Sequence, residues 1–181
     1  MDETALHWVF GYGSLIWRPG FDFVRSERAL LKGAHRSLSI YSHVYRGTPE
    51  VPGLVFGLAR GGSCGGMAFG VGAEVWEPTL AYLRERELVS DVYLEAMRPV
   101  RLQSGATVSA VTYLINAAHG QYAGRLTIAE QVDLVRRGHG QSGANTDYVL
   151  NTVEHLRVLG IRDRALERLA AALAAPVGEA A

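Results

Sequence analysis

The sequence has a single cysteine, Cys64, so the chain can form neither an internal disulfide nor a metal site built from several thiolates. It has no run of about 18 apolar residues, which a membrane-spanning helix would need. Lysine and arginine total 18, and aspartate and glutamate also total 18, so the basic excess of a nucleic-acid-binding protein is missing. These absences argue against disulfide-stabilised, membrane-spanning and nucleic-acid-binding classes.

The composition is that of a globular protein, with 48% hydrophobic and 20% charged residues in a chain of 181. This length suits one domain over residues 1–181, with a frayed tail from about residue 175 in the segment PVGEAA. The first residues, MDETALHW, are acidic and lack the basic start and apolar core of a secretory signal. We therefore expect a cytoplasmic protein. Nothing in the sequence gives the oligomeric state.

Strand patterns dominate the first two thirds of the chain, and many of them are interrupted by glycine. Strands with so many glycines often bend sharply or close into a barrel. The pattern predicts strands over His7–Tyr12, Arg36–Tyr41, Leu54–Ala59, Met67–Trp76, Tyr93–Leu102 and Thr107–Ile115.

Helix patterns dominate the rest. Thr127 and Glu130 form a capping box that predicts a helix to Arg137, and Pro78 suits the first turn of a helix from Glu77 to Leu88. The other predicted helices run from an N-cap at Asn145 to Leu159 and from Arg162 to Ala174. Strands followed by helices predict an α+β fold, not an alternating parallel α/β fold.

Glu87 is the carboxylate that stands out on the predicted helix PTLAYLREREL. With side chains about 100° apart, Glu87 falls between Leu80 and Leu83 on the apolar stripe, whereas Glu85 falls on the opposite side. Burial favours the neutral form of a carboxyl group and makes it a usable proton shuttle near neutral pH. The alternative is a structural ion pair with Arg84 or Arg36, which the pattern alone favours about equally.

A glycine-rich loop, GYGSL, follows the first predicted strand. Its amides, unshielded by side chains, could hold a carboxylate or an oxyanion, although a plain tight turn is the commoner outcome. A dinucleotide fingerprint and a P-loop are excluded, because the third glycine and a Gly-Lys-Ser/Thr sequence are missing. Ser14 could be a nucleophile only with a base, and none of the six histidines has a triad order or zinc-ligand spacing.

The segment GQSGANTDY, residues 140–148, opens a predicted helix. Its amides and the hydroxyl of Ser142 could contact an anionic ligand, although an ordinary capping loop is more common.

Five segments taken together resemble one family, the ChaC proteins, which are glutathione-specific γ-glutamylcyclotransferases. The resemblance covers about residues 7 to 165. The segments are WVFGYGSLIWRPGF, YRGTPEVPG (45–53), YLRERELVSDVY (82–93), QYAGRLTIAEQV (121–132) and GQSGANTDYVLNTVEHLRVLGI (140–161).

The resemblance implies a small mixed β-barrel with flanking helices and a lyase reaction that splits glutathione into 5-oxoproline and cysteinylglycine without a cofactor or metal. The substrate's own α-amine attacks its γ-carbonyl, so the enzyme needs no nucleophile. The family's catalytic glutamate corresponds to Glu87, which the helical pattern also singles out. The substrate-binding residues that this resemblance implies are Tyr12, Gly13, Ser14, Leu15, Arg46, Tyr122, Ser142 and Tyr148.

Some positions depart from the family pattern. Val44 and Tyr45 follow His43 where the family often has an aspartate-histidine pair, and CGGMAFG and Ser-Asp-Val-Tyr replace other common residues. These differences concern the strictness of glutathione specificity more than the reaction type. The alternatives are the same chemistry on another γ-glutamyl amine or dipeptide, and a non-catalytic γ-glutamyl-binding or regulatory protein.

Overall fold

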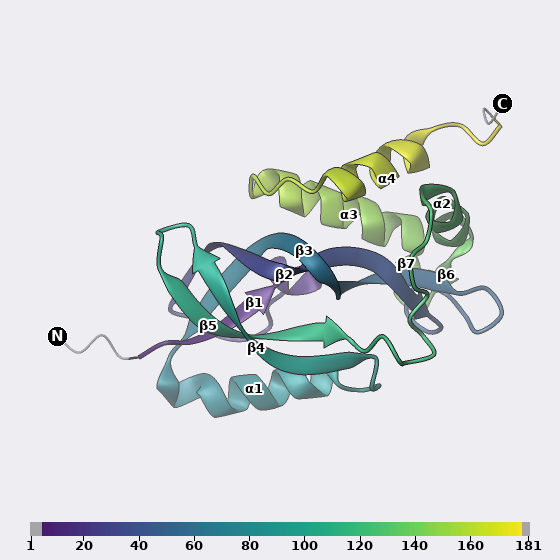
Figure 1. The fold of residues 1–181 in the computed structure, drawn as a ribbon. Helices are drawn as coiled ribbons and strands as arrows, with labels where there is room; N and C mark the ends of the chain where they lie inside the picture. The colour runs from purple at the N-terminus through teal and green to yellow at the C-terminus, as the bar shows by residue number, and fades with distance from the viewer. Residues whose placement is uncertain (1–4, 179–181) are drawn as a thin grey trace. The chain divides into compact units, whose positions relative to one another are not determined.

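The computed structural model describes residues 5–178, and the first four residues of the chain and part of the expected frayed tail lie outside this range. The chain divides into two compact units, residues 1–37 with 57–120 and residues 38–56 with 121–181. The elements are β1 (His7–Gly11), η1 (Ser14–Ile16), β2 (Arg25–Ser42), β3 (Gly53–Val71), α1 (Ala73–Glu87), β4 (Tyr93–Leu102), β5 (Thr107–Ile115), α2 (Ile128–Arg137), β6 (His139–Gly140), β7 (Gly143–Ala144), α3 (Asn145–Val158) and α4 (Arg164–Ala174) (Figure 1).

Five strands close into a barrel in the order β1-β3-β2-β4-β5. Most neighbours are antiparallel, as in the β4–β5 hairpin, where Tyr93 is opposite Ile115. The β1–β5 and β3–β5 pairs are parallel, so the barrel is mixed. The predicted α+β class with a small mixed barrel and flanking helices is therefore confirmed.

Two strands are much longer than the sequence pattern predicted. β2 extends the predicted segment at both ends, and β3 joins two predicted strands into one of 19 residues. The apparent break was the glycine-rich stretch around Gly61 and Gly62. Both glycines have positive φ, of 95° and 71°, so the strand bends there without ending.

Helix α1 starts at Ala73, four residues earlier than predicted, and the predicted strand Met67–Trp76 is wrong beyond Val71. Val75 and Trp76 look like strand residues, but they lie on α1 and pack against the core of the first unit. Pro78 lies inside the helix and not near its first turn, at an exposed position where the missing N–H leaves only the carbonyl one turn earlier without an intrahelical donor.

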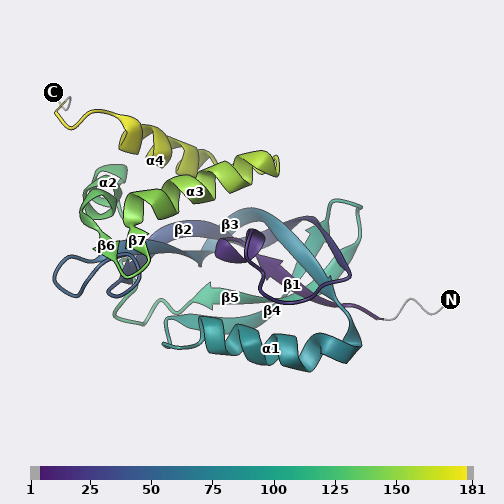
Figure 2. The same cartoon turned by 180° about the vertical axis from the view of Figure 1, so that it is seen from behind.

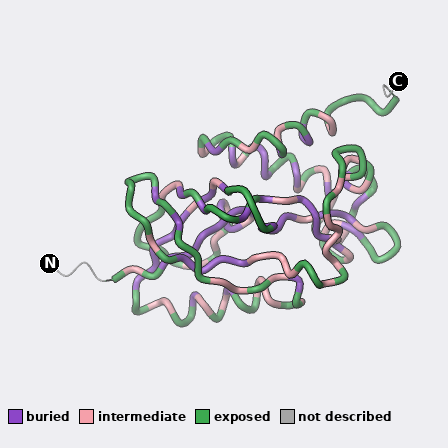
Figure 3. The backbone as a smooth tube through the Cα atoms, in the orientation of Figure 1, coloured by how far each residue is buried: buried purple, intermediate pink, exposed green. Residues whose placement is uncertain are grey.

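The core of the first unit lies where α1 covers the barrel strands. Leu83 of α1, Val9 of β1, and Val111 and Tyr113 of β5 belong to one buried cluster, which also includes Leu15. Figure 2 shows α1 from behind, lying along β4 and β5. In Figure 3 the outward side of α1 is exposed, whereas its inward side is intermediate or buried. The fold thus holds the C-terminal end of α1 against the barrel.

Helices α2, α3 and α4 pack against one another in the second unit (Figure 1). The capping box of Thr127 and Glu130 is confirmed. Asn145 is not an N-cap as predicted: the cap position is Ala144, and the Asn145 side chain is buried elsewhere. The last helix starts two residues later than predicted, with Asp163 as its N-cap.

Candidate active site at the end of helix α1

Glu87 is the last residue of α1, and its side chain is 16% exposed. This placement agrees with the apolar stripe predicted for the helix. Burial raises the pKa of the Glu87 carboxyl above its usual range, and the nearby Arg86 guanidinium partly opposes this shift. The arrangement makes Glu87 a carboxyl group that can exchange a proton nearer to neutral pH than an exposed glutamate can.

The alternative that Glu87 pairs with Arg84 or Arg36 is wrong in its partners. Arg84 forms two hydrogen bonds with Glu95, at 3.0 and 2.8 Å. Within the described residues 5–178, the ion pair of Glu87 is with Arg86, at 3.6 Å from Nε to Oε1.

Arg36 instead binds the backbone of the glycine-rich loop GYGSL, residues 11–15, which is called the glycine turn below. This residue is buried in β2 and donates hydrogen bonds to two backbone oxygens, Tyr12 O and Gly65 O, both at 2.6 Å. It therefore fixes the backbone just before Gly13. The sequence pattern suggested Arg36 only as a partner for Glu87, although a charged residue within a half-buried strand pattern is a signal for such a structural role.

The glycine loop forms a single turn of 3₁₀ helix over Ser14–Ile16, closed by a hydrogen bond from Ile16 N to Gly13 O at 2.9 Å. In such a turn the first donor is the fourth residue, so the amides of Gly13, Ser14 and Leu15 are not used within it. Leu15 is buried in the core of the first unit, and Ser14 is half-buried. The turn therefore has three backbone N–H groups and one hydroxyl at a fixed position.

Ser14 is bound by Arg86, which donates from Nη2 to Ser14 Oγ at 2.8 Å. A guanidinium has only N–H donors and keeps its proton at any ordinary pH, so it cannot act as a base. The contact disfavours the serine-hydrolase hypothesis, because a serine nucleophile needs a neighbouring group that removes its proton. No sequence motif singled out Arg86, and its position directly before Glu87 was the available signal.

Arg46 and Tyr148 lie together in the second unit. The Arg46 guanidinium stacks over the Tyr148 ring, 5.2 Å from its centre, and Nη1 donates to Ala144 O at 3.1 Å. The Tyr148 hydroxyl accepts a hydrogen bond from Phe56 N at 3.2 Å. Of the other predicted binding residues in this unit, Ser142 is exposed beside this group, and half-buried Tyr122 is paired with Ile40 of β2.

The prediction that segment 140–148 offers unused amides is wrong for two of them. Gln141 N donates to Val44 O, and Ser142 N donates to Tyr45 O, both at 2.9 Å. These amides join the hairpin β6–β7 to the loop that follows β2.

The side chain of Asn145, the first residue of α3, binds the backbone of Leu54 near the start of β3. Its side-chain amide donates to Leu54 O at 2.8 Å and accepts from Leu54 N at 2.7 Å. Gly53, the last residue of the motif YRGTPEVPG, lies so close that an added Cβ would overlap the Arg46 carbonyl oxygen. In this region the family-like glycines and Asn145 are explained by close backbone packing.

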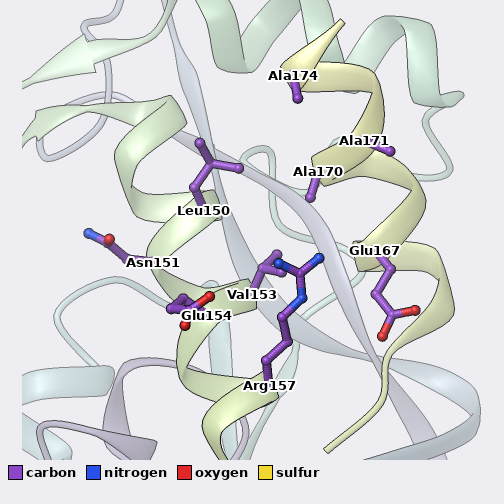
Figure 4. A pocket seen from close by; sticks show the side chains of 9 residues that line it. All are labelled: Leu150, Asn151, Val153, Glu154, Arg157, Glu167, Ala170, Ala171 and Ala174. Carbon is purple, nitrogen blue, oxygen red and sulfur yellow. The ribbon is translucent and has the colours of Figure 1, made fainter.

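A cavity of about 470 Å³ lies between α3 and α4, apart from the predicted site residues. Figure 4 shows that Arg157 extends into the space between Val153 and α4. The lining residues are Leu150, Asn151, Val153, Glu154, Arg157, Glu167, Ala170, Ala171 and Ala174.

Residues 5–178 contain no cluster of three or more histidine, cysteine, aspartate or glutamate side chains placed to hold a metal ion. Nor does any helix within that range have the length and apolar character to cross a membrane.

Comparison with known proteins gives a consistent result. The family model described as ChaC-like protein matches residues 7–175. The glutathione-specific γ-glutamylcyclotransferase of Escherichia coli K12 is 32% identical over 90% of this chain and 70% of its own length. The zebrafish (Danio rerio) glutathione-specific γ-glutamylcyclotransferase 1 is 34% identical over 83% of this chain and 79% of its own length.

The fold is also found in a crystal structure of a yeast γ-glutamyl cyclotransferase specific to glutathione. It superimposes with a TM-score of 0.84 over 93% of this chain and 96% of the yeast chain, at 20% identity. The family model covers almost the whole chain, including the glycine turn and Glu87. The chain therefore belongs to the ChaC-like protein family.

Proposed function

We propose that this chain is a γ-glutamylcyclotransferase that cleaves glutathione into 5-oxoproline and cysteinylglycine, and that Glu87 carries the proton transfers. The observation that carries the proposal is the half-buried Glu87 carboxyl, linked through Arg86 to the glycine turn at Ser14. Family membership and the names of the bacterial and zebrafish relatives support the substrate.

The reaction is an intramolecular acyl transfer. The α-amine nitrogen of the glutamyl group bonds to its own γ-carbonyl carbon, and the bond from that carbon to the cysteine nitrogen breaks. The attacking ammonium group loses two protons as it becomes a lactam N–H. One passes to the leaving nitrogen, which becomes a free amine, and the other passes to solvent. Fixing the flexible glutamyl arm in a folded conformation supplies much of the rate acceleration, because the reacting atoms are already in one molecule.

Glu87 is assigned both proton transfers. As a carboxylate it accepts a proton from the attacking amine, and as a carboxylic acid it returns that proton to the leaving nitrogen. Burial raises the pKa of Glu87, which makes its carboxylate a stronger base toward the amine than an exposed glutamate would be.

The glycine turn is assigned to binding. The amides of Gly13, Ser14 and Leu15 are candidates to stabilise the oxyanion that forms on the γ-carbonyl oxygen. Tyr12 belongs to the same segment, and Arg36 fixes its carbonyl. The rigidity of this backbone supports the assignment, because donors held in place need no reorganisation during the reaction.

Residues of the second unit are assigned to substrate binding as well. The free α-carboxylate of the substrate is bound either by Arg46 or by the turn amides, and a guanidinium suits a carboxylate through paired N–H donors. Within the Arg46 guanidinium, the hydrogen bond found among the described residues is the one from Nη1, so other guanidinium donors remain for a ligand. Tyr122, Ser142 and Tyr148 complete the proposed binding residues.

The test is to incubate purified protein with glutathione and to measure 5-oxoproline and cysteinylglycine. Glu87→Gln keeps the shape of the side chain but cannot transfer a proton, so it should abolish turnover while retaining binding. Glu85→Gln is the matched control, because Glu85 is exposed on the same helix. Release by the wild type and by Glu85→Gln only is expected.

A folded wild-type protein that releases neither product would contradict the glutathione proposal. The same assay with other γ-glutamyl dipeptides and amines then tests the alternative substrates. Binding without any turnover across this panel would favour a γ-glutamyl-binding protein instead.

A further inference from the structure

Arg86 is the most highly connected side chain near Glu87. Its guanidinium is half-buried and donates to two side-chain oxygens, Ser14 Oγ at 2.8 Å and Tyr82 OH at 2.9 Å. It also donates to two backbone oxygens, Arg18 O at 2.7 Å and Pro19 O at 3.4 Å. One side chain thus joins α1 to both ends of the segment from Ser14 to Pro19.

The segment also wraps closely around the same helix. Gly20 has a φ of 75°, and an added Cβ there would overlap the Tyr82 hydroxyl, which itself accepts from Arg86. A connected set of contacts therefore links Arg86 and Tyr82 of α1 to the segment from Ser14 to Gly20. A displacement of the guanidinium would release the glycine turn from α1.

The direction of the Arg86–Ser14 hydrogen bond has a chemical consequence. Arginine can only donate, so Ser14 Oγ is the acceptor, and its own proton remains available to another acceptor. The guanidinium thus fixes Ser14 as a donor toward a bound ligand. A carboxylate or carbonyl oxygen of a substrate would be such an acceptor.

Arg86 also acts on Glu87 through charge. Its Nε lies 3.6 Å from Glu87 Oε1, and the positive charge lowers the pKa of Glu87 against the larger effect of burial. Among the described residues, Tyr113 of β5 interacts with the charge of Glu87, and burial is the chief cause of its own raised pKa. Glu95 and Arg84, which bind each other, also act on Tyr113, and Tyr82 accepts a hydrogen bond from Arg86. Of these, Arg86 alone touches both the carboxyl and the glycine turn.

We propose that Arg86 is a positioning residue for the cyclotransferase reaction, which holds the glycine turn in place through Ser14 and sets its positive charge next to the Glu87 carboxyl. The inference rests on the proposed function, because it requires that Glu87 and the turn act on one substrate. It goes beyond that function by giving one side chain two separable effects, one geometric and one electrostatic.

Two substitutions separate these effects. Arg86→Gln removes both the charge and the forked donor, so kcat should fall by about 10–100-fold, as for a misplaced binding group. The acid limb of the kcat profile should also move to higher pH, because Glu87 loses the charge that favours its carboxylate. Arg86→Lys keeps the charge, so the acid limb should stay near the wild-type position while kcat/KM falls, since an ammonium cannot bridge four oxygens.

A third measurement tests the contact itself. Ser14→Ala and the double variant Ser14→Ala/Arg86→Gln complete a mutant cycle, in which the combined loss of kcat/KM should be smaller than the product of the single losses. Glu85→Gln is the control for a change of side chain on the same helix. Circular dichroism and thermal unfolding report the folded fraction of each variant.

The outcomes are distinguishable. A wild type that releases no 5-oxoproline contradicts the proposed function, whereas an active wild type with an unshifted Arg86→Gln profile overturns the positioning role alone. If the loss of activity in Arg86→Gln equals its loss of folded protein, Arg86 has a structural role only, and this result also overturns the positioning role. If Arg86→Gln does not fold, Arg86→Lys decides: reduced kcat/KM with a wild-type acid limb supports the proposal, and unchanged kcat/KM refutes it.

Discussion

The end of α1 and the hairpin β6–β7 hold their loops by different means. At α1 a long cationic side chain reaches out to the glycine turn and donates to four oxygens. At the hairpin, backbone amides donate hydrogen bonds directly to the loop after β2, and glycines allow these two backbone segments to approach closely. The first arrangement depends on a side chain at the rim of the core, and the second depends on the backbone itself.

This difference separates function from stability. Glu87 and Arg86 remain partly exposed, so changing them alters charge and hydrogen bonding without emptying the core. Asn145 is completely buried, and its amide is the partner of a buried backbone N–H and C=O. We expect substitutions at the first place to change activity first, and substitutions at the second place to change stability first.

The largest effect is expected for Glu87→Gln, with a loss of about 10²–10⁴-fold in kcat, the usual contribution of a general acid–base group. Its stability should not fall. Because the folded protein raises the pKa of Glu87, the folded state binds more protons than the unfolded state, and stability decreases as the pH rises through this range. Glu87→Gln should therefore be at least as stable as the wild type at neutral pH.

Thermal unfolding measured over a range of pH checks the sign of this stability difference between Glu87→Gln and the wild type. The advantage of Glu87→Gln over the wild type should disappear in acid, where Glu87 is protonated in both states. A variant that is less stable than the wild type at neutral pH would show that the carboxylate contributes to folding, and would break the separation between the two regions.

The next effect is expected for Asn145→Ala. It leaves two buried backbone groups of Leu54 without partners, at about 1–3 kcal/mol each. Asn151→Ala is the matched control, because Asn151 is exposed on the same helix. Denaturant unfolding should show a loss for Asn145→Ala alone, and a fully stable Asn145→Ala with reduced activity would contradict the comparison.

The sequence pattern predicted the α+β class, and it predicted the strands β4 and β5 and the capping box of α2 because each has a strong local signal. The small mixed barrel was implied by the family resemblance. The sequence pattern failed where long-range packing decides the structure. Val75 and Trp76 look like strand residues, yet β3 ends at Val71, Gly72 caps α1, and both residues pack from α1 against the core of the first unit. Periodicity cannot distinguish the two outcomes in so short an apolar stretch.

In the candidate site, too, features with a local sequence signal could be predicted, whereas contacts between distant positions could not. Glu87 was found from the helical stripe and from the family resemblance, since both are properties of one segment. The contacts of Arg36 and Arg86 join positions 29 and 72 residues apart in the chain, so no local pattern could assign their partners. Asn145 was predicted to be an N-cap because asparagine is common at that position. Its hydrogen bonds are instead with Leu54, 91 residues away, and no local pattern could predict that partner.

A smaller effect is expected for Thr127→Ala in the second unit. Thr127 accepts from Glu130 N, while the Glu130 carboxylate accepts from Thr127 N at 2.7 Å. Loss of such a cap typically reduces stability by about 0.5–2 kcal/mol. Thr127→Ser keeps the hydroxyl and should recover most of the loss in thermal unfolding, whereas an equal loss in both variants would show that the cap hydrogen bond is not the cause.

The smallest effect is expected for Glu95→Gln, which gives the sharpest contrast with Glu87 because both carboxyls belong to the first unit. Arg84 holds the pKa of Glu95 below its usual range by hydrogen bonding and charge. This lowered pKa means that Glu95 contributes stability above its unfolded pKa and loses it as the pH falls through the folded value. The pair is partly solvent-exposed, so Glu95→Gln should reduce stability at neutral pH by less than about 1 kcal/mol. Thermal unfolding of the two variants from acid to neutral pH should therefore give differences of opposite sign, and equal signs would show that burial and pairing do not distinguish these carboxyls.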